Sequence, residues 1–407
     1  MVAHRAGTRP VLSALTAMLA ISCSTAAGDE TPARTGQPYA STRAPLVLPP
    51  GEVGFLSNAY SDTIDVFRMA PLERLASYPV GRVPIDIDGA SHLALDKAGG
   101  AIYLALPYPQ VGASTGPHAE HSSSVRAGYI QKLSVAEFRD LGSVRVDENP
   151  ADMALSDDGR RLVATHFDLT RATSKGLPPE ERKGALVTID TARHFTNTDI
   201  AAPRLRVCRA PHGVVLSPGN GQFAFVACYS DDTIAKVNLD TKEIALQALG
   251  PAPNESDTPN IGPYALALSN TASRLAVAST ESKDVRIIDA GSLASVGAPI
   301  PVGAAAYFPA WSKDETRIFV PTQSPDAVLV LDVAKGQIAA QRSFTQAECE
   351  RPHSVRVSND GNRVFVVCEG DRKKNGALLV LDARTLETAA RQVTGVYPDR
   401  IVTTVGP

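Results

Sequence analysis

Two stretches of the chain repeat the same arrangement of cysteine, proline and histidine. They read CRAPHGVVLSPGNGQFAFVAC and CERPHSVRVSNDGNRVFVVC, and in each a Pro-His pair follows the first cysteine. Histidine can bind a metal ion or move a proton near neutral pH, so His212 and His353 are candidate metal ligands or ligand contacts. The structural alternative, in which each imidazole bonds a neighbouring backbone carbonyl, is favoured because the two histidines lie in separated repeats.

The cysteines of these stretches predict two disulfides. In each stretch the first cysteine precedes a predicted strand, and the second ends the next strand of the same hairpin. The start of one antiparallel strand lies beside the end of its partner, within the ~5.5 Å Cα separation of a disulfide. We therefore expect Cys208–Cys228 and Cys349–Cys368.

A unit of four short strands recurs along the chain and predicts an all-β fold. The first strand of each unit ends in a polar residue, a turn follows, and two β-rich runs and a weaker fourth run come next. Units of this kind are typical of propeller blades. The polar residues recur every 43 to 61 positions, at Asp96, Ser156, Ser217, Ser269, Ser312, Ser358 and Thr404.

The two ends of the repeat region complete one another. Residues 53–67 supply a second and a third strand without a first, whereas the C-terminal DRIVTTV is a first strand with nothing after it. Joined, they make one blade, which gives seven four-stranded antiparallel blades and leaves no open sheet edge. We expect one propeller domain over residues 51–407.

Three strings in these units carry a family resemblance: FLSNAYSDTIDVF, FAFVACYSDDTIAKVNLDT and IFVPTQSPDAVLVLDVAKG. They resemble the YVTN-repeat propellers, as does the linking segment Val80-Gly81-Arg82-Val83-Pro84. The resemblance covers residues 51–407. It implies the seven-bladed fold and leaves function open, because propellers of this kind include binding proteins, surface proteins, lactonases and redox subunits.

The innermost strands predict which side chains line the central channel. The residue five positions before each polar anchor falls at the start of an inner strand, where it can face the channel. These residues are Ser91, Ala151, His212, Tyr264, Tyr307, His353 and Asp399. Arg209 and Arg351 precede two of them on the same face, and the insertions 109–126, with His118 and His121, and 168–183 rise beside it. This loop-rich face is the predicted binding face.

The N-terminus predicts export. His4, Arg5 and Arg9 precede an apolar run of about eleven residues, too short to span a bilayer, and Ser22-Cys23 follows. We interpret residues 1–23 as a signal peptide of the lipoprotein type with lipidation at Cys23, ordinary cleavage nearby being the alternative. Residues 24–50 read as a flexible linker. The expected location is the cell envelope, at the outer membrane or in the periplasm.

The composition of the chain and the motifs that it lacks reduce the number of function classes to consider. A net charge of −3 without a basic stripe disfavours nucleic acid, and no Cys-x-x-Cys-His motif supports covalent haem. No cofactor is predicted, although a metal ion held by His212 and His353 is an alternative. The favoured function is a non-catalytic binding or scaffold protein, a monomer whose partner is an envelope protein or small ligand. A lactonase-like hydrolase or a redox subunit is the alternative.

Overall fold

The computed structural model describes residues 46–83, 85–96, 98, 100–110, 123–195, 202–251 and 258–406. The chain divides into a unit of residues 1–30 and a unit of residues 31–407. The predicted signal peptide, Cys23, His118 and His121 therefore lie outside the described residues, as does the linker up to residue 45. In the part of the chain that is described, no helix is long and apolar enough to cross a membrane.

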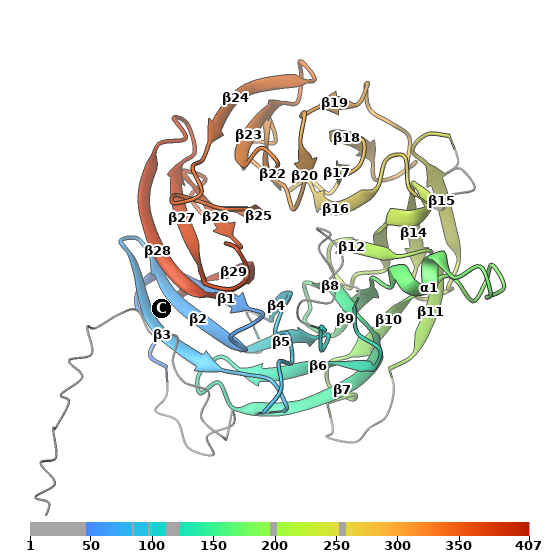
Figure 1. Cartoon of the computed structure of the whole chain (residues 1–407), viewed down its shortest axis with the longest axis horizontal. Coiled ribbons are helices and arrows are strands. Elements are labelled where there is room, and N and C mark those ends of the chain that lie inside the picture. The colour runs from blue at the N-terminus through green and yellow to red at the C-terminus, as the bar shows by residue number, and fades with distance from the viewer. Residues whose placement is uncertain are drawn as a thin grey trace, which may run out of the picture. The chain divides into compact units, whose positions relative to one another are not determined.

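The second unit consists of seven sheets arranged in a ring (Figure 1). Blade 1 joins the two ends of the propeller. From the channel outwards its strands are β29 (Pro398–Gly406), β1 (Gly51–Asn58), β2 (Thr63–Met69) and β3 (Leu72–Pro79). Because β1 pairs with β29 from Gly51↔Gly406 to Asn58↔Pro398, the predicted composite blade is confirmed.

Blades 2 to 4 follow in chain order. Blade 2 contains β4 (Leu93–Asp96), β5 (Ala101–Leu106), β6 (Ala127–Ser134) and β7 (Asp140–Glu148). Blade 3 contains β8 (Pro150–Leu155), β9 (Arg161–His166), β10 (Gly184–Asp190) and β11 (Arg204–Cys208), with the short helix α1 (Leu169–Thr173) between β9 and β10. Blade 4 contains β12 (Pro211–Leu216), β13 (Phe223–Cys228), the 3-10 turn η1 (Tyr229–Asp231), β14 (Thr233–Asn238) and β15 (Ile244–Ala248).

Blades 5 to 7 complete the ring. Blade 5 contains β16 (Pro263–Leu268), β17 (Arg274–Ser279), β18 (Asp284–Asp289) and β19 (Ile300–Pro301). Blade 6 contains β20 (Ala305–Ala306), β21 (Ala310–Trp311), β22 (Arg317–Gln323), β23 (Ala327–Asp332) and β24 (Gln337–Ser343). Blade 7 contains β25 (Pro352–Val357), β26 (Arg363–Cys368), β27 (Asn375–Asp382) and β28 (Thr388–Val396).

The hydrophobic core lies between neighbouring blades, because the second and third strands are apolar on both faces. β5, for example, is AIYLAL and is buried at every position, whereas the outermost β24 is exposed at nearly every position. The apolar clusters accordingly join residues of successive blades, such as Phe225 of β13 with Leu266 of β16. This packing fixes each blade against the next and holds the seven inner strands around one channel.

Both predicted disulfides are confirmed. Cys208 and Cys228 have their Cα atoms 5.7 Å apart, and Cys349 and Cys368 have theirs 5.2 Å apart. As expected, Cys208 precedes β12 and Cys228 ends β13 of blade 4; in addition, Cys208 ends β11, the outermost strand of blade 3. That bridge therefore joins two blades. The second pair links the segment before β25 to the end of β26 within blade 7.

Candidate ligand-binding site in the propeller channel

The inner strands start with a repeated backbone feature that brings side chains into the channel. β8, β12, β16 and β25 each begin with a proline, and the residue before it has a positive φ, as at Asn149 (53°) and Ala210 (48°). Regular pairing with the second strand is then interrupted by a bulge; in β12 it passes from Pro211↔Cys228 to Val214↔Val226. Bulges re-aim side chains. Two successive residues thus lie at the channel.

The predicted residues His212 and Tyr264 pack together at the centre of the channel. Their rings are stacked, with centroids 3.7 Å apart and an interplanar angle of 25°. His212 Nδ1 lies 3.0 Å from the carbonyl oxygen of Tyr264, so the imidazole donates to the neighbouring blade's backbone in the corresponding tautomer. Both side chains are completely buried, and burial raises the pKa of Tyr264 well above its usual value. The structural alternative for His212 fits this geometry.

His353 lies between two carboxylates. Its Nδ1 is 3.2 Å from Asp399 Oδ1, and its Nε2 is 3.7 Å from Glu369 Oε1. Burial disfavours the charged imidazole, but the carboxylates of Glu369 and Asp399 outweigh it and raise the pKa of His353 above its ordinary value. Glu369 in turn pairs with Arg372 at 2.7 Å. The two carboxylates thus favour the protonated form of the His353 imidazole.

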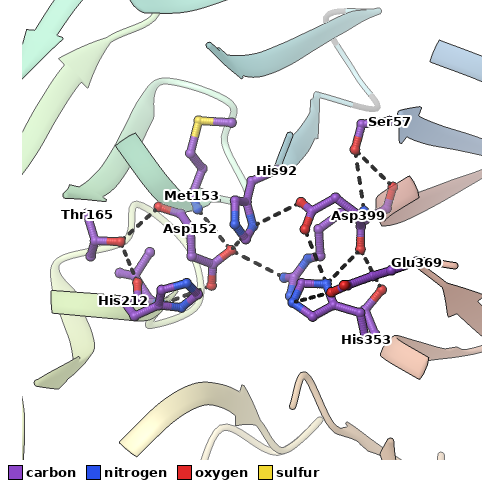
Figure 2. Close-up of polar contacts among 12 residues, drawn as sticks. Ser57, His92, Asp152, Met153, Thr165, His212, His353, Glu369 and Asp399 are labelled. Carbon is purple, nitrogen blue, oxygen red and sulfur yellow. Dashed lines mark hydrogen bonds and ion pairs between the residues drawn. The ribbon is translucent and has the colours of Figure 1, made fainter. Parts of the chain in front are cut away.

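Like Glu369, two further residues of this network, His92 and Asp152, were not predicted from the sequence (Figure 2). His92 Nδ1 lies 3.5 Å from Asp152 Oδ1 and 3.6 Å from Asp399 Oδ2, so it bridges carboxylates from blades 3 and 1. Asp152 also accepts the Val214 N–H at 3.0 Å. Both residues are one position further along the chain than Ser91 and Ala151, the predicted channel residues. For Asp152 the bulge at the start of β8 explains the difference, because it turns the second residue inwards as well. His92 comes directly before β4, whose pairing with β5 is regular.

Arg400 ends the network on the side away from the loop-rich face. Its guanidinium is 3.4 Å from Asp152 Oδ1 and lies 3.9 Å over the ring of Phe308. Burial pushes the pKa of Asp152 up, yet Arg400, His92 and the Val214 N–H together hold it below its usual value. We use the name channel network for His92, Asp152, His353, Glu369, Asp399 and Arg400.

The remaining predicted site residues lie around this network. Tyr307 is buried, and its ring centroid is 5.4 Å from that of His353. Arg209 instead contacts the neighbouring turn η1, through Asp231 and the Ser230 carbonyl. Arg351 has a positive φ of 53°, and its backbone N–H donates to Asp326 at 2.9 Å. The structure therefore gathers the aromatic, histidine and aspartate candidates, whereas the recorded contacts of the two arginines are in the surrounding loops.

The network has the residue types of acid–base chemistry but little access to solvent. The side chains of His92, Asp152, His353, Glu369 and Asp399 are at most 2% exposed. Within the described residues, no three histidine, cysteine, aspartate or glutamate side chains are grouped as metal ligands would be. A general acid or base must come within hydrogen-bond reach of its substrate. In this conformation these five buried groups join blades and are not presented to a substrate, whereas the Arg400 side chain is 23% exposed.

Comparisons with known proteins identify the fold and no family. No protein-family profile matches the chain, and no curated protein matches it. Among solved structures it is similar to a putative 6-phosphogluconolactonase from Bacteroides uniformis, with 15% identity and a TM-score of 0.61 over 87% of this chain and 100% of that one. It is also similar to the periplasmic gluconolactonase of Pseudomonas aeruginosa, with 15% identity and a TM-score of 0.61 over 88% of this chain and 100% of that one.

A dihydro-heme d1 dehydrogenase is a third similar structure, with 16% identity and a TM-score of 0.56 over 89% of this chain and 77% of that one. Identities this low establish a shared architecture only. The chain is a seven-bladed β-propeller. The resemblance of its repeats to the YVTN family stays a resemblance, because no family profile matches.

Proposed function

We propose that this propeller is a non-catalytic binding protein of the bacterial cell envelope. The observation that carries the proposal is the burial of the channel network, whose acid–base groups are engaged with one another across blades 1, 2, 3 and 7. In this proposal the ion pairs between these groups stabilise the closed ring and do not act on a substrate. Binding is then the task of exposed surfaces supported by the ring.

The envelope location is the second part of the proposal. The export signal expected in residues 1–23 and the two disulfides support it, because disulfides persist in oxidising compartments. In this proposal Cys23 carries the lipid, residues 24–50 act as the tether, and the loop-rich face meets a small ligand or an envelope protein. Substitution of Cys23 by serine should release the protein from the membrane fraction, which cell fractionation measures.

The second candidate function is a lactonase-like hydrolase. It is favoured by one observation in the channel, the contact of His353 with both Asp399 and Glu369, which gives a histidine of raised pKa beside carboxylates. Two of the similar structures are described as gluconolactonases. A conformational change that exposed His353 would be needed before it could act.

Hydrolysis of glucono-1,5-lactone and 6-phosphogluconolactone by the purified protein, followed by alkali uptake at constant pH, separates the two candidates. Under the binding proposal the rate equals the spontaneous rate for the wild type and for the His353→Gln variant. An enzymatic rate that is lost in folded His353→Gln protein would reject the binding proposal and support the hydrolase. Circular dichroism of both proteins controls for folding.

A further inference from the structure

The channel contains a cavity on the side of the channel network away from the loop-rich face. Its volume is about 380 Å³. It is formed by the inner strands of blades 4 to 7 and 1 and the turns that follow three of them, and its lining includes Phe308, Trp311, Lys313, Arg356 and Arg400. The turn residues Asn270, Lys313 and Asn359 are exposed, so the cavity reaches the surface there.

The charge of this cavity is of one sign. Among the lining residues that the structure describes, Lys313, Arg356 and Arg400 are cationic and none is acidic. The whole chain has a net charge of −3, so the cavity is positive against the average of the molecule. Positively lined hollows with low-dielectric walls concentrate anions.

Arg356 is the least compensated of the three. It is partly buried, and its recorded side-chain bond in the described residues is from Nε to Thr403 Oγ1 at 2.8 Å. Burial lowers the pKa of its guanidinium, Glu52 offsets this effect without forming an ion pair, and the positive charge of Arg400 adds to the lowering. The outer nitrogens of Arg356, with their donor hydrogens, are not used by that bond. An anion placed between Arg356 and Arg400 would relieve their mutual repulsion.

Aromatic side chains make the same cavity suitable for an organic body. Phe308 lines it under the guanidinium of Arg400, and Trp311 lines it with its Nε1–H already bonded to the Ala267 carbonyl at 2.9 Å. The indole therefore offers an apolar surface to the cavity. The cavity therefore combines two aromatic faces with a mostly polar lining.

We propose that this cavity binds a small organic anion, with its carboxylate or phosphate against Arg356 and Arg400 and its body against Trp311 and Phe308. The inference rests on the proposed binding function and adds to it a ligand class and a second site, on the side of the channel away from the loop-rich face. Charge-assisted bonds to two guanidinium groups would orient the anionic group, since arginine matches carboxylate and phosphate in geometry.

The single tryptophan of the chain gives a direct measurement, because Trp311 lies in the cavity wall. The protein is expressed from the full-length chain and purified. It is then titrated with benzoate, phenyl phosphate and inorganic phosphate at low ionic strength while Trp311 fluorescence is recorded. We expect a saturable change with benzoate or phenyl phosphate and a weaker change with inorganic phosphate. Comparison of benzoate with phenyl phosphate distinguishes a carboxylate from a phosphate ligand. Comparison of both with inorganic phosphate shows whether the aromatic body contributes to binding.

Two variants test the assigned groups. Arg356→Gln removes the positive charge, so the dissociation constant should rise about 10-fold, and Lys313→Gln at the exposed rim should raise it about 3-fold. Arg274→Gln is the matched control. The Arg274 guanidinium lies 5.2 Å from the Trp311 ring but does not line the cavity, so its loss should change the starting fluorescence and leave the dissociation constant unchanged.

The proposal is overturned if no probe up to about 10 mM, the weak-binding limit for a small-molecule site, gives a saturable change. Equal affinities in wild type and Arg356→Gln overturn it too, provided that circular dichroism and thermal unfolding show the variant to be folded. The probes cannot be hydrolysed as lactones are. A failure here is therefore distinct from a failure of the non-catalytic function, which the lactone assay alone decides.

Discussion

His353 and His166 are buried histidines in opposite electrostatic surroundings. His353 faces Glu369 and Asp399, which raise its pKa despite burial. His166 ends β9, bonds the Ala185 carbonyl through Nδ1 at 3.0 Å, and has its pKa lowered mainly by burial. The two residues therefore bind protons in opposite ways when the chain folds.

Their pKa shifts predict a pH dependence of stability. The raised pKa of His353 contributes stability that is complete below the unfolded pKa of about 6.5 and is lost as pH rises through the folded value. We expect the thermal midpoint of the wild type to fall as pH rises above about 6.5, and this fall to be smaller in His353→Gln. An unchanged alkaline slope in the variant would contradict the assignment.

The lowered pKa of His166 predicts a loss of stability on the acidic side. Its lowered pKa contributes stability that is present above about pH 6.5 and is lost as pH falls through the folded value, because the unfolded chain then binds a proton that the fold excludes. Replacing His166 by glutamine should flatten the decline of the thermal midpoint between pH 6.5 and 5. The same scan of His353→Gln, which keeps His166, serves as its control.

At the scale of single residues, the sequence predicted some of the side chains that lie in the channel. Counting back five positions from the polar anchors identified His212, Tyr264, His353 and Asp399 as residues of the channel, and all four are buried there. His92, Asp152, Glu369 and Arg400 were missed. Spacing alone does not show that the bulges in β8 and β29 turn Asp152 and Arg400 inwards, although the proline that begins each of these strands is a usable signal. No such signal marks His92 or Glu369.

Among the elements, β12 approaches β16 closely because residue 213 is glycine. A Cβ at Gly213 would lie 2.8 Å from both the Ala265 Cα and the Tyr264 carbonyl oxygen, which are backbone atoms that cannot move aside cheaply. We expect Gly213→Ala to destabilise the protein by roughly 1–3 kcal/mol, as other overpacked sites do. Gly176→Ala, where no atom lies within 4 Å, is the control, and thermal unfolding is the measurement.

The Cys208–Cys228 bridge ties the last strand of blade 3 to blade 4. A closed loop of this length, with a sequence separation of 20, gives about 3 kcal/mol in the chain-entropy model. A Cys208→Ser/Cys228→Ser double variant should therefore unfold at a lower temperature than the wild type. Reducing agent should then lower its midpoint less than that of the wild type. Equal midpoints before reduction would show that the bridge adds no stability.

The whole ring depends on β29, which supplies both the inner strand of blade 1 and two members of the channel network, Asp399 and Arg400. A chain truncated after Tyr397 should lose cooperative unfolding and associate, because β1 would present an open strand edge. Size-exclusion chromatography and thermal unfolding test this expectation. A monomeric truncated protein with the wild-type midpoint would contradict it.

The ring itself was predictable because a propeller repeats one unit. Seven recurrences of a polar anchor, and the unmatched strands at residues 53–67 and at the C-terminus, determined both the blade count and the closure. The path of the first disulfide between blades was not predictable. Residues 204–208 form β11, the fourth strand of blade 3, and no sequence pattern shows that this weak fourth strand extends to the cysteine.

The pairing of β29 with β1 also has a consequence for the timing of biosynthesis. β1 is among the first strands of the propeller to be made, yet its inner partner, beginning at Pro398, is the last (Figure 1). During synthesis and any passage through a membrane, blade 1 must wait for the entire ring to emerge. The newly made chain therefore stays incompletely folded until its final residues arrive, which suits a protein that is threaded through a translocation pore before it closes.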